Sequence, residues 1–276
     1  MTFDRYEMIH KVLETSKARA YENLHRFDRD TESAVSVNKN LLMTIINDSK
    51  DTEYGKKYGF CEIHDPESYR EQVPLTDYSD YADYIERMID GESNILTAYP
   101  VVYYAQTSGT SGKPKNVPVS ERGLNVFRDY ANSFTLSTIS EFHKTTRLKD
   151  MSDGLRLCVV NLAQHTFPSG ARYGVMSAAC MRDENLPFMP FIFSTPYEAM
   201  SCSENADLKY IHALFGLSER SVNLLISAFI PALLDLMNYI RDKWRLLVND
   251  IRTGTISKEI IIPASLCEKL SAKNFT

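Results

Sequence analysis

Apolar residues recur every three or four positions in the first fifty residues, a spacing that places them on one face of a helix. The apolar positions between Tyr6 and Leu13 predict a first helix that ends near His25. Those between Leu41 and Ile46 predict a second helix. We therefore expect residues 1–50 to form a helical lead-in.

Residues 51–91 combine turn signals with a third helical pattern. Gly55 and Gly59 stand among aromatic residues, which predicts a turn. An extended segment should follow, then a helix that Asp77 caps and that stops at Gly91. Three tyrosines at helical spacing are expected to form the half-buried face of that helix: Tyr78, Tyr81 and Tyr84.

Strand patterns appear after residue 100. Val101–Ala105 predicts a strand, Asn116–Val119 predicts a second short strand, and Ser120 is placed to cap a helix that runs to about His143. The apolar run Leu155–Ala163, with β-branched residues, is typical of a buried strand. The segment between residues 106 and 116 should therefore be a loop that joins two strands.

The second half of the chain is dominated by helical spacing. Residues 164–181 mix turn residues with aromatics and predict a loop that forms a pocket wall. Helical spacing returns at Asp207–Phe215 and is strongest over Ser218–Asp250, where Pro231 should mark a kink or a helix junction. Strands that alternate with helices around the loop predict the α/β class; the resemblance described below implies a mixed sheet flanked by helices.

Composition excludes several classes of protein. The 276 residues carry 31 lysines and arginines against 36 acids, a net charge of −5 with no basic stripe, so no nucleic-acid partner is expected. The longest apolar stretch, Leu224–Met237, is too short to span a bilayer, so no membrane partner is expected. Five scattered cysteines form no CxxC pair, and the N-terminus lacks the pattern of a signal peptide. We expect a cytoplasmic protein with reduced thiols.

The densest chemistry lies in the run TSGTSGKPK, residues 107–115. Glycines allow backbone N–H groups to turn toward one anion, hydroxyls add donors and lysines add charge, which together favour phosphate binding. The hydroxyl side chains are Thr107, Ser108, Thr110 and Ser111; the glycines are Gly109 and Gly112; the lysines are Lys113 and Lys115.

Three alternatives for this loop fit less well. A Walker loop requires GxxxxGK followed by Ser or Thr, whereas Gly109 and Gly112 are three positions apart and Pro114 follows Lys113. A dinucleotide loop requires GxGxxG and opens a helix, whereas this loop returns to extended chain. A plain linker would not explain the lysines or the strands on both sides.

The run closely resembles the phosphate loop of the adenylate-forming superfamily. Several other segments narrow the resemblance to the Gretchen Hagen (auxin-responsive promoter) family of acyl acid amido synthetases. They are VPLTDY from Val73, GESNILT from Gly91, NVPVS from Asn116, DLKYIHALFGL from Asp207 and WRLLVNDIRTG from Trp244. The resemblance covers the chain from about residue 50 onward. It implies the N-terminal part of the adenylate-forming (acyl-activating) synthetase fold.

The resemblance also implies the activity and its residues. Such enzymes use ATP and Mg²⁺ to convert an acyl acid into an acyl adenylate, which an amine or amino acid then intercepts. Lys115 is the implied catalytic residue, because the superfamily places a lysine after the proline, and no metal ligand is assigned. The implied phosphate-binding residues are Thr107, Ser108, Gly109, Thr110, Ser111 and Gly112.

Three other polar residues each allow a functional and a structural interpretation. His165 could line an acyl pocket or be structural, and Arg172 could meet a substrate carboxylate or form a surface ion pair. Asp250 could imitate a ribose-binding acid, but its place at a helix end favours capping or solvation.

Two later motifs of the superfamily, which contact adenine, Mg²⁺ and ribose, have no counterpart in this sequence. The nearest string, Tyr197–Glu204, has the wrong spacing. We therefore expect residues 1–276 to be an incomplete N-terminal ATP- and acyl-binding domain, with the phosphate loop and its strands at residues 99–120 and no C-terminal lid domain. Alone it would be inactive, and helices such as Leu224–Met237 would expose apolar surface. A split gene with a separately encoded C-terminal half as partner, an early stop and an artificially shortened chain are the three explanations for such a fragment. The alternative is a non-catalytic module that binds a nucleotide or a protein.

Overall fold

The chain divides into two compact units, neither of which is continuous in sequence. Residues 17–139 and 165–179 form one, called here the hairpin unit, and residues 1–16, 140–164 and 180–276 form the other, the C-terminal unit. The computed structural model describes residues 5–107, 109, 112–130, 134, 154–181, 186 and 189–271, with the backbone alone at residues 5–17, 268, 269 and 271.

The chain begins with the two helices that the apolar spacing predicts. They are α1 (Arg5–Glu32), which continues beyond the predicted end at His25, and α2 (Ala34–Ser49). Ile46 on α2 is buried with Tyr54, Phe60 and Ile63 in the first core cluster of the hairpin unit.

Gly55 lies in a short helix, so the prediction of a turn there is wrong. Helix α3 (Glu53–Lys57) starts at Thr52, whose hydroxyl oxygen accepts a hydrogen bond from the Gly55 N–H at 2.9 Å. A Cβ at Gly55 would lie 2.1 Å from the Ser49 carbonyl oxygen, so the glycine allows the backbones of α2 and α3 to approach closely. Gly59, with a φ of 59°, is in the left-handed region that the predicted turn requires.

The segment that Asp77 caps is a short turn followed by a helix. After η1 (Phe60–Glu62) and α4 (Pro66–Gln72), the Asp77 carboxylate accepts the Ser79 N–H at 2.7 Å and starts the 3₁₀ turn η2 (Tyr78–Asp80). Helix α5 (Ala82–Ile89) follows and stops before Gly91, whose φ is 105°. The three tyrosines are half-buried as predicted.

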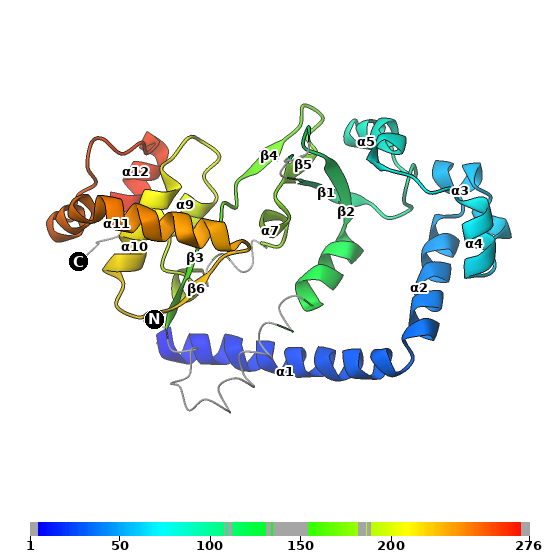
Figure 1. Ribbon diagram of the computed structural model, residues 1–276, viewed down its shortest axis with the longest axis horizontal. Coiled ribbons are helices and arrows are strands. Elements are labelled where there is room, and N and C mark those ends of the chain that lie inside the picture. The colour runs from blue at the N-terminus through cyan, green and yellow to red at the C-terminus, as the bar shows by residue number, and fades with distance from the viewer. Residues whose placement is uncertain are drawn as a thin grey trace. The chain divides into compact units, whose positions relative to one another are not determined.

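The hairpin unit contains a mixed sheet with the strand order β2-β1-β5-β4 (Figure 1). β1 (Val101–Gln106) pairs antiparallel with β2 (Asn116–Ser120), which confirms the predicted strand, loop and strand. β1 also pairs in parallel with β5 (Arg172–Gly174), next to β4 (Gln164–Thr166). The Ser120 hydroxyl accepts the Gly123 N–H at 3.2 Å and caps a helix described over residues 121–130; the rest of its predicted extent, except residue 134, lies outside the described residues.

Residues 164–181 form strands β4 and β5 and helix α7 (Met176–Ala179), so the prediction of a loop there is wrong. Each strand has three residues, which is too short for a period of two to be recognised in the sequence. β5 is defined by its pairing with β1, about 70 positions earlier in the chain, where Tyr104 aligns with Tyr173.

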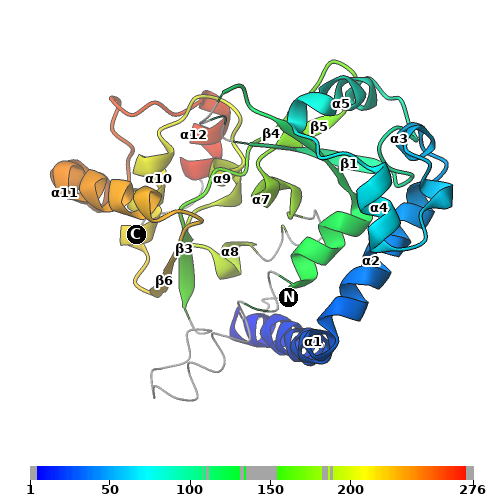
Figure 2. The ribbon, with the colours of Figure 1, turned by 45° about the vertical axis from the view of Figure 1, so that its right-hand side comes forward.

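The C-terminal unit surrounds a pair of parallel strands, β3 (Leu155–Cys158) and β6 (Val222–Ile226). Its helices are α8 (Met189–Ile192), α9 (Tyr197–Met200), α10 (Leu208–Ser218), α11 (Ile230–Thr253) and α12 (Ala264–Ser271). Figure 2 shows α10 and α11 side by side. Strand β3 and helix α10 confirm predicted elements, although the strand ends at Cys158 instead of Ala163.

The prediction of helical structure over residues 218–250 is confirmed from Ile230 onward, where α11 begins, and is wrong before that residue. Residues 222–226 form β6, and Pro231 lies in the first turn of α11, where a proline has no hydrogen bond to lose. A short apolar run does not by itself distinguish a strand from a helix, and here the pairing with β3 decides.

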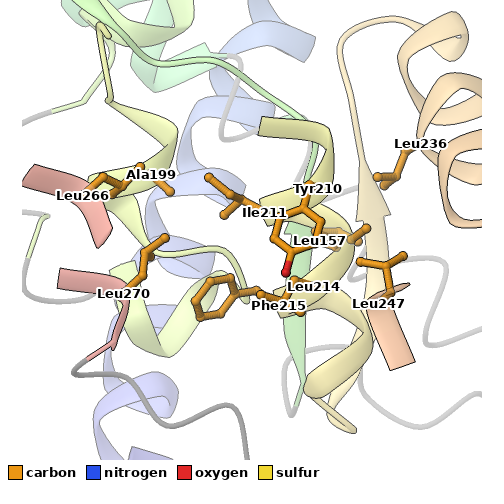
Figure 3. Close-up of a cluster of buried hydrophobic side chains, with 11 residues drawn as sticks. Leu157, Ala199, Tyr210, Ile211, Leu214, Phe215, Leu236, Leu247, Leu266 and Leu270 are labelled. Carbon is orange, nitrogen blue, oxygen red and sulfur yellow. The ribbon is translucent and has the colours of Figure 1, made fainter. Parts of the chain in front are cut away.

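The core of this unit is built around α10 (Figure 3). Tyr210, Ile211, Leu214 and Phe215 from α10 meet side chains of four other elements. Those side chains are Leu157 of β3, Ala199 of α9, Leu236 and Leu247 of α11, and Leu266 and Leu270 of α12.

Candidate functional site

The phosphate-loop candidate forms the tip of the β1–β2 hairpin. The Thr107 N–H donates to the Lys115 carbonyl oxygen at 3.0 Å, and the Lys115 N–H donates to the Thr107 hydroxyl oxygen at 3.0 Å. These two bonds close the base of the loop directly beyond the last strand pair, Gln106 and Asn116. The antiparallel hairpin therefore fixes both ends of residues 107–115.

The structure describes part of the predicted phosphate-binding set. Thr107, Gly109, Gly112 and Lys115 are described, whereas Ser108, Thr110 and Ser111 lie outside the described residues. Thr107, Gly112 and Lys115 are exposed. The described residues thus place the candidate site on the surface of the hairpin unit.

The two glycines have different roles in the loop. Gly109 has a φ of 67°, and a Cβ there would lie 2.9 Å from the Gly112 carbonyl oxygen and 3.0 Å from the Pro114 ring. Only glycine fits that position without strain. Gly112 has a φ of 154°, and outside its two chain neighbours no atom of the described residues lies within 4 Å of the place that a Cβ would take. The described part of the loop therefore leaves space beside Gly112.

Lysine side chains are the described charges of the loop. Lys113 and Lys115 are both exposed, and neither forms an ion pair with a carboxylate among the described residues. The positive charge of Lys115 acts on Asp77. Hydrogen bonds from Ser79 are the main cause of the lowered pKa of Asp77, and the charge of Lys115 lowers this pKa further. The loop therefore retains positive charge that an anion could neutralise.

Sequence reasoning missed Tyr78 as a residue of this site. Its hydroxyl accepts the Asn116 N–H at 3.0 Å, and the Lys115 ammonium lies 5.3 Å from the centre of its ring. The helical spacing of the tyrosines explains only their burial. A contact between residues 38 positions apart has no signature in the sequence.

The described part of the loop fits an anion through its lysines and the Thr107 hydroxyl. Three of its described N–H groups are already used: Thr107 donates to the Lys115 carbonyl oxygen, Lys115 donates to the Thr107 hydroxyl oxygen, and Gly112 donates to the Gly109 carbonyl oxygen at 3.0 Å. The described residues contain no group of three or more His, Cys, Asp or Glu side chains that could hold a metal ion.

The weaker candidates lie elsewhere. His165 is exposed and its ring is 5.3 Å from that of Tyr173, and Arg172 is exposed and has no ion pair within the part of the chain that the structure describes. Asp250 is buried: its carboxylate accepts hydrogen bonds from the Tyr210 hydroxyl at 2.7 Å and the Ser257 hydroxyl at 2.7 Å. This network joins α10, α11 and the following turn, so Asp250 is structural and not solvated.

Fold and loop together define an α/β protein that carries an open, lysine-bearing hairpin loop on a mixed sheet. The family model described as "GH3 family N-terminal domain" matches residues 23–276 of this chain. The chain therefore belongs to the GH3 family, which confirms the resemblance to the Gretchen Hagen synthetases.

Curated relatives are similar over most of this chain. It is 27% identical to indole-3-acetic acid-amido synthetase GH3.2 of Arabidopsis thaliana over 259 residues, 92% of this chain and 46% of that protein. It is 29% identical to the putative indole-3-acetic acid-amido synthetase GH3.9 of the same plant, over 87% of this chain and 41% of the relative. The chain thus spans less than half the length of these relatives.

Solved structures confirm the fold. The GH3.15 acyl acid amido synthetase matches with a TM-score of 0.70 at 22% identity, over 86% of this chain and 41% of that one. AtGH3.15 in complex with 2,4-DB matches all of this chain with a TM-score of 0.69. The fold is therefore α/β with a mixed sheet flanked by helices, as in the N-terminal part of these synthetases. None of the described helices is both long enough and apolar enough to cross a membrane.

Proposed function

We propose that the chain is the N-terminal ATP- and acyl-binding domain of an ATP-dependent acyl acid amido synthetase. The observation that carries the proposal is the open hairpin loop with two lysines unpaired by any described carboxylate, in a chain of the GH3 family. In the proposed reaction, an acyl acid attacks the α-phosphorus of ATP, pyrophosphate leaves, and an amine or amino acid takes the acyl group from the adenylate. The named activity of the relatives supports this reaction class.

The loop residues have distinct proposed roles. Lys115 neutralises charge that develops on the phosphates, which is the main contribution a protein makes to displacement at phosphorus. The Thr107 hydroxyl donates to a phosphate oxygen, since its oxygen already accepts the Lys115 N–H. Ser108, Gly109, Thr110, Ser111 and Gly112 complete the proposed contact surface, and Gly109 supplies the backbone geometry that the tip requires.

Mg²⁺ enters the proposal as the ion that accompanies ATP and offsets its charge. Because no described cluster of side chains could hold a metal, we assign no residue to it. We also propose a cytoplasmic location, which the spacing of the five cysteines supports because they form no CxxC pair.

The test compares two lysines of one loop. Lys115→Met should weaken binding of ATP to this chain about tenfold or more, the effect of losing a charged hydrogen bond. Lys113→Met, the matched control, removes the same charge two positions away and should change the affinity less than about threefold. Isothermal titration with ATP and Mg²⁺ measures both. Equal effects of the two substitutions, or none, would contradict the role of Lys115.

The greater length of the relatives suggests a second experiment, which compares this chain alone with this chain mixed with the rest of a relative. Because the chain spans 46% of a curated relative, we propose that catalysis needs the remaining polypeptide, supplied separately or in one chain. Pyrophosphate release with a panel of carboxylic acids should appear when this chain is mixed with the missing portion of a relative. Alone, the chain should bind ATP, which at 100 times its Kd adds about 2.7 kcal/mol to stability. A chain that ATP does not stabilise would instead favour a protein-binding module.

A further inference from the structure

Tyr78 links a different part of the chain to the exit of the loop. The residue opens η2, and its half-buried ring packs beside Ile85, Met88, Ile95 and Tyr104. These buried side chains come from α5, the following loop and β1. The ring is therefore held by the core of the hairpin unit while its hydroxyl end reaches the loop.

The Tyr78 hydroxyl forms hydrogen bonds with both the backbone N–H and the backbone carbonyl oxygen of Asn116. It accepts the Asn116 N–H at 3.0 Å and lies 3.4 Å from the Asn116 carbonyl oxygen, to which it donates. β2 is the edge strand of the sheet, so these groups face no further strand. A third bond, from the Gln106 amide to the Asn116 side-chain oxygen at 3.3 Å, holds the side chain of the same residue from β1. Asn116 follows Lys115 directly, so the two bonds of Tyr78 fix the backbone from which that lysine projects.

The ring of Tyr78 also holds the Lys115 side chain. The ammonium lies 5.3 Å from the ring centre, within the range of a cation–π interaction. Lys113 offers a contrast inside the same loop, since it has no aromatic contact among the described residues. The two lysines therefore differ in freedom even though both are exposed.

We propose that Tyr78 is a positioning residue for Lys115. The hydroxyl fixes the backbone at the loop exit, and the ring holds the ammonium beside the loop before a nucleotide binds. Tyr78 acts through Lys115 and touches no phosphate itself. A lysine that is already confined loses less side-chain freedom when it binds, which favours affinity. The inference rests on the proposed phosphate-binding role of Lys115.

The first test requires no nucleotide. Limited acetylation with acetic anhydride, read by peptide mass spectrometry, compares the rates at which Lys115 and Lys113 are modified. Lys115 should react about two- to fivefold more slowly, because the ring covers and holds its ammonium. Tyr78→Leu should remove this difference, and Tyr78→Phe, which keeps the ring, should retain most of it. Equal rates in the unaltered chain, or a difference that survives Tyr78→Leu, would overturn the proposal.

The second test separates this inference from the proposed function. Tyr78→Leu should weaken ATP binding about two- to fivefold in the unaltered chain and have no effect after Lys115→Met, since its action passes through the lysine. Equal losses in both backgrounds would show a merely structural role and overturn the proposal. If Lys115→Met leaves ATP binding intact while the acetylation pattern follows expectation, the proposed function fails but the contact stands.

Tyr78→Phe keeps the test sharp if Tyr78→Leu fails to fold. It removes the hydroxyl alone and should speed hydrogen exchange at the Asn116 N–H about two- to tenfold, the effect of one lost hydrogen bond. Exchange of the Tyr104 N–H, within β1, serves as the control and should not change. An unchanged rate at Asn116 would overturn the anchoring role of the hydroxyl.

Discussion

His212 is a neutral imidazole in the core of the C-terminal unit. The Thr195 hydroxyl and His212 Nδ1 are 2.9 Å apart, and His212 Nε2 lies 3.2 Å from the Val160 carbonyl oxygen. A carbonyl accepts only, so Nε2 carries the proton and Nδ1 accepts from Thr195. Burial lowers the pKa of His212 to about 4.

This burial makes stability depend on pH in a defined window. The folded pKa of about 4 lies below the ordinary 6.5, so the unfolded chain binds the proton first as pH falls. Unfolding free energy should be unaffected by His212 above pH 6.5 and fall between about 6.5 and 4, by about 3 kcal/mol in all. Urea unfolding between pH 7.5 and 4.5 measures it.

Two substitutions assign that pH dependence to one residue. His212→Gln keeps a donor and an acceptor but does not titrate, so it should flatten the slope. His165→Gln, at an exposed position, should leave the slope unchanged. If His212→Gln shows the same slope as the unaltered chain, another group causes it.

For single residues, the sequence predicts which side chains can bind a ligand better than it predicts which residues contact one another in the fold. The hydroxyls, glycines and lysines of residues 107–115 are recognisable because they are consecutive. Tyr78 is 38 positions from its partner Asn116, and its spacing is explained equally well by a buried helix face. The burial of Asp250 was missed for the same reason, because it depends on Tyr210 and Ser257.

Among the elements, two glycines in helices should respond to alanine in opposite directions. In α3, a Cβ at Gly55 would lie 2.1 Å from a backbone oxygen, so Gly55→Ala should destabilise by about 1–3 kcal/mol through overpacking. In the helix at residues 121–130, Gly123 is exposed and its nearest neighbour would be 3.5 Å away, an ordinary contact. Gly123→Ala should stabilise by up to about 1 kcal/mol.

Chemical denaturation of the two variants checks this pair. Helix propensity favours alanine at both sites, so only the close approach of α2 and α3 separates them. A stabilising Gly55→Ala would show that these backbones are farther apart than the structure places them.

Elements were predictable where their own residues determine them. Helices α1, α2 and α10 have long apolar faces, and β1 and β2 flank a recognisable loop. Strands β4 and β5 were missed because three residues are too few to show a period of two. Strand β6 was missed because its apolar run merges with the helical pattern that follows it. Pro231 was misplaced because a proline inside a helical pattern and one in a first turn look alike when β6 is not recognised.

Across the whole molecule, the expected apolar exposure is present on α11 and the residues before it. Phe229 and Ile230 are each 73% exposed, and further exposed side chains follow along the helix. These are Leu234, Met237, Trp244 and Val248. Leu236 and Leu247, on a different face of the helix, are fully buried. One helix thus has a packed face and an apolar face in contact with solvent.

Adjacent residues of α11 should therefore behave differently. Leu236→Ala should lower the free energy of unfolding by about 2–5 kcal/mol, since it leaves a cavity in the core. Met237→Gln should change it by less than about 0.5 kcal/mol and reduce self-association, because that side chain is 42% exposed. Denaturation and sedimentation velocity measure the two effects. A destabilising Met237→Gln would mean that the exposed face is packed in solution.

The interleaved composition of the two units sets the order in which they can be completed during synthesis. The backbone passes between them at residues 16/17, 139/140, 164/165 and 179/180. The hairpin unit is complete in sequence only once Ala179 has left the ribosome, because β5 lies beside β1. The first part of α1, residues 5–16, belongs to the same unit as residues 180–276 and must wait for them, whereas residues 17–32 of the same helix belong to the hairpin unit. Such distant pairings fold slowly, so the two parts of α1 find their partners at different stages of synthesis.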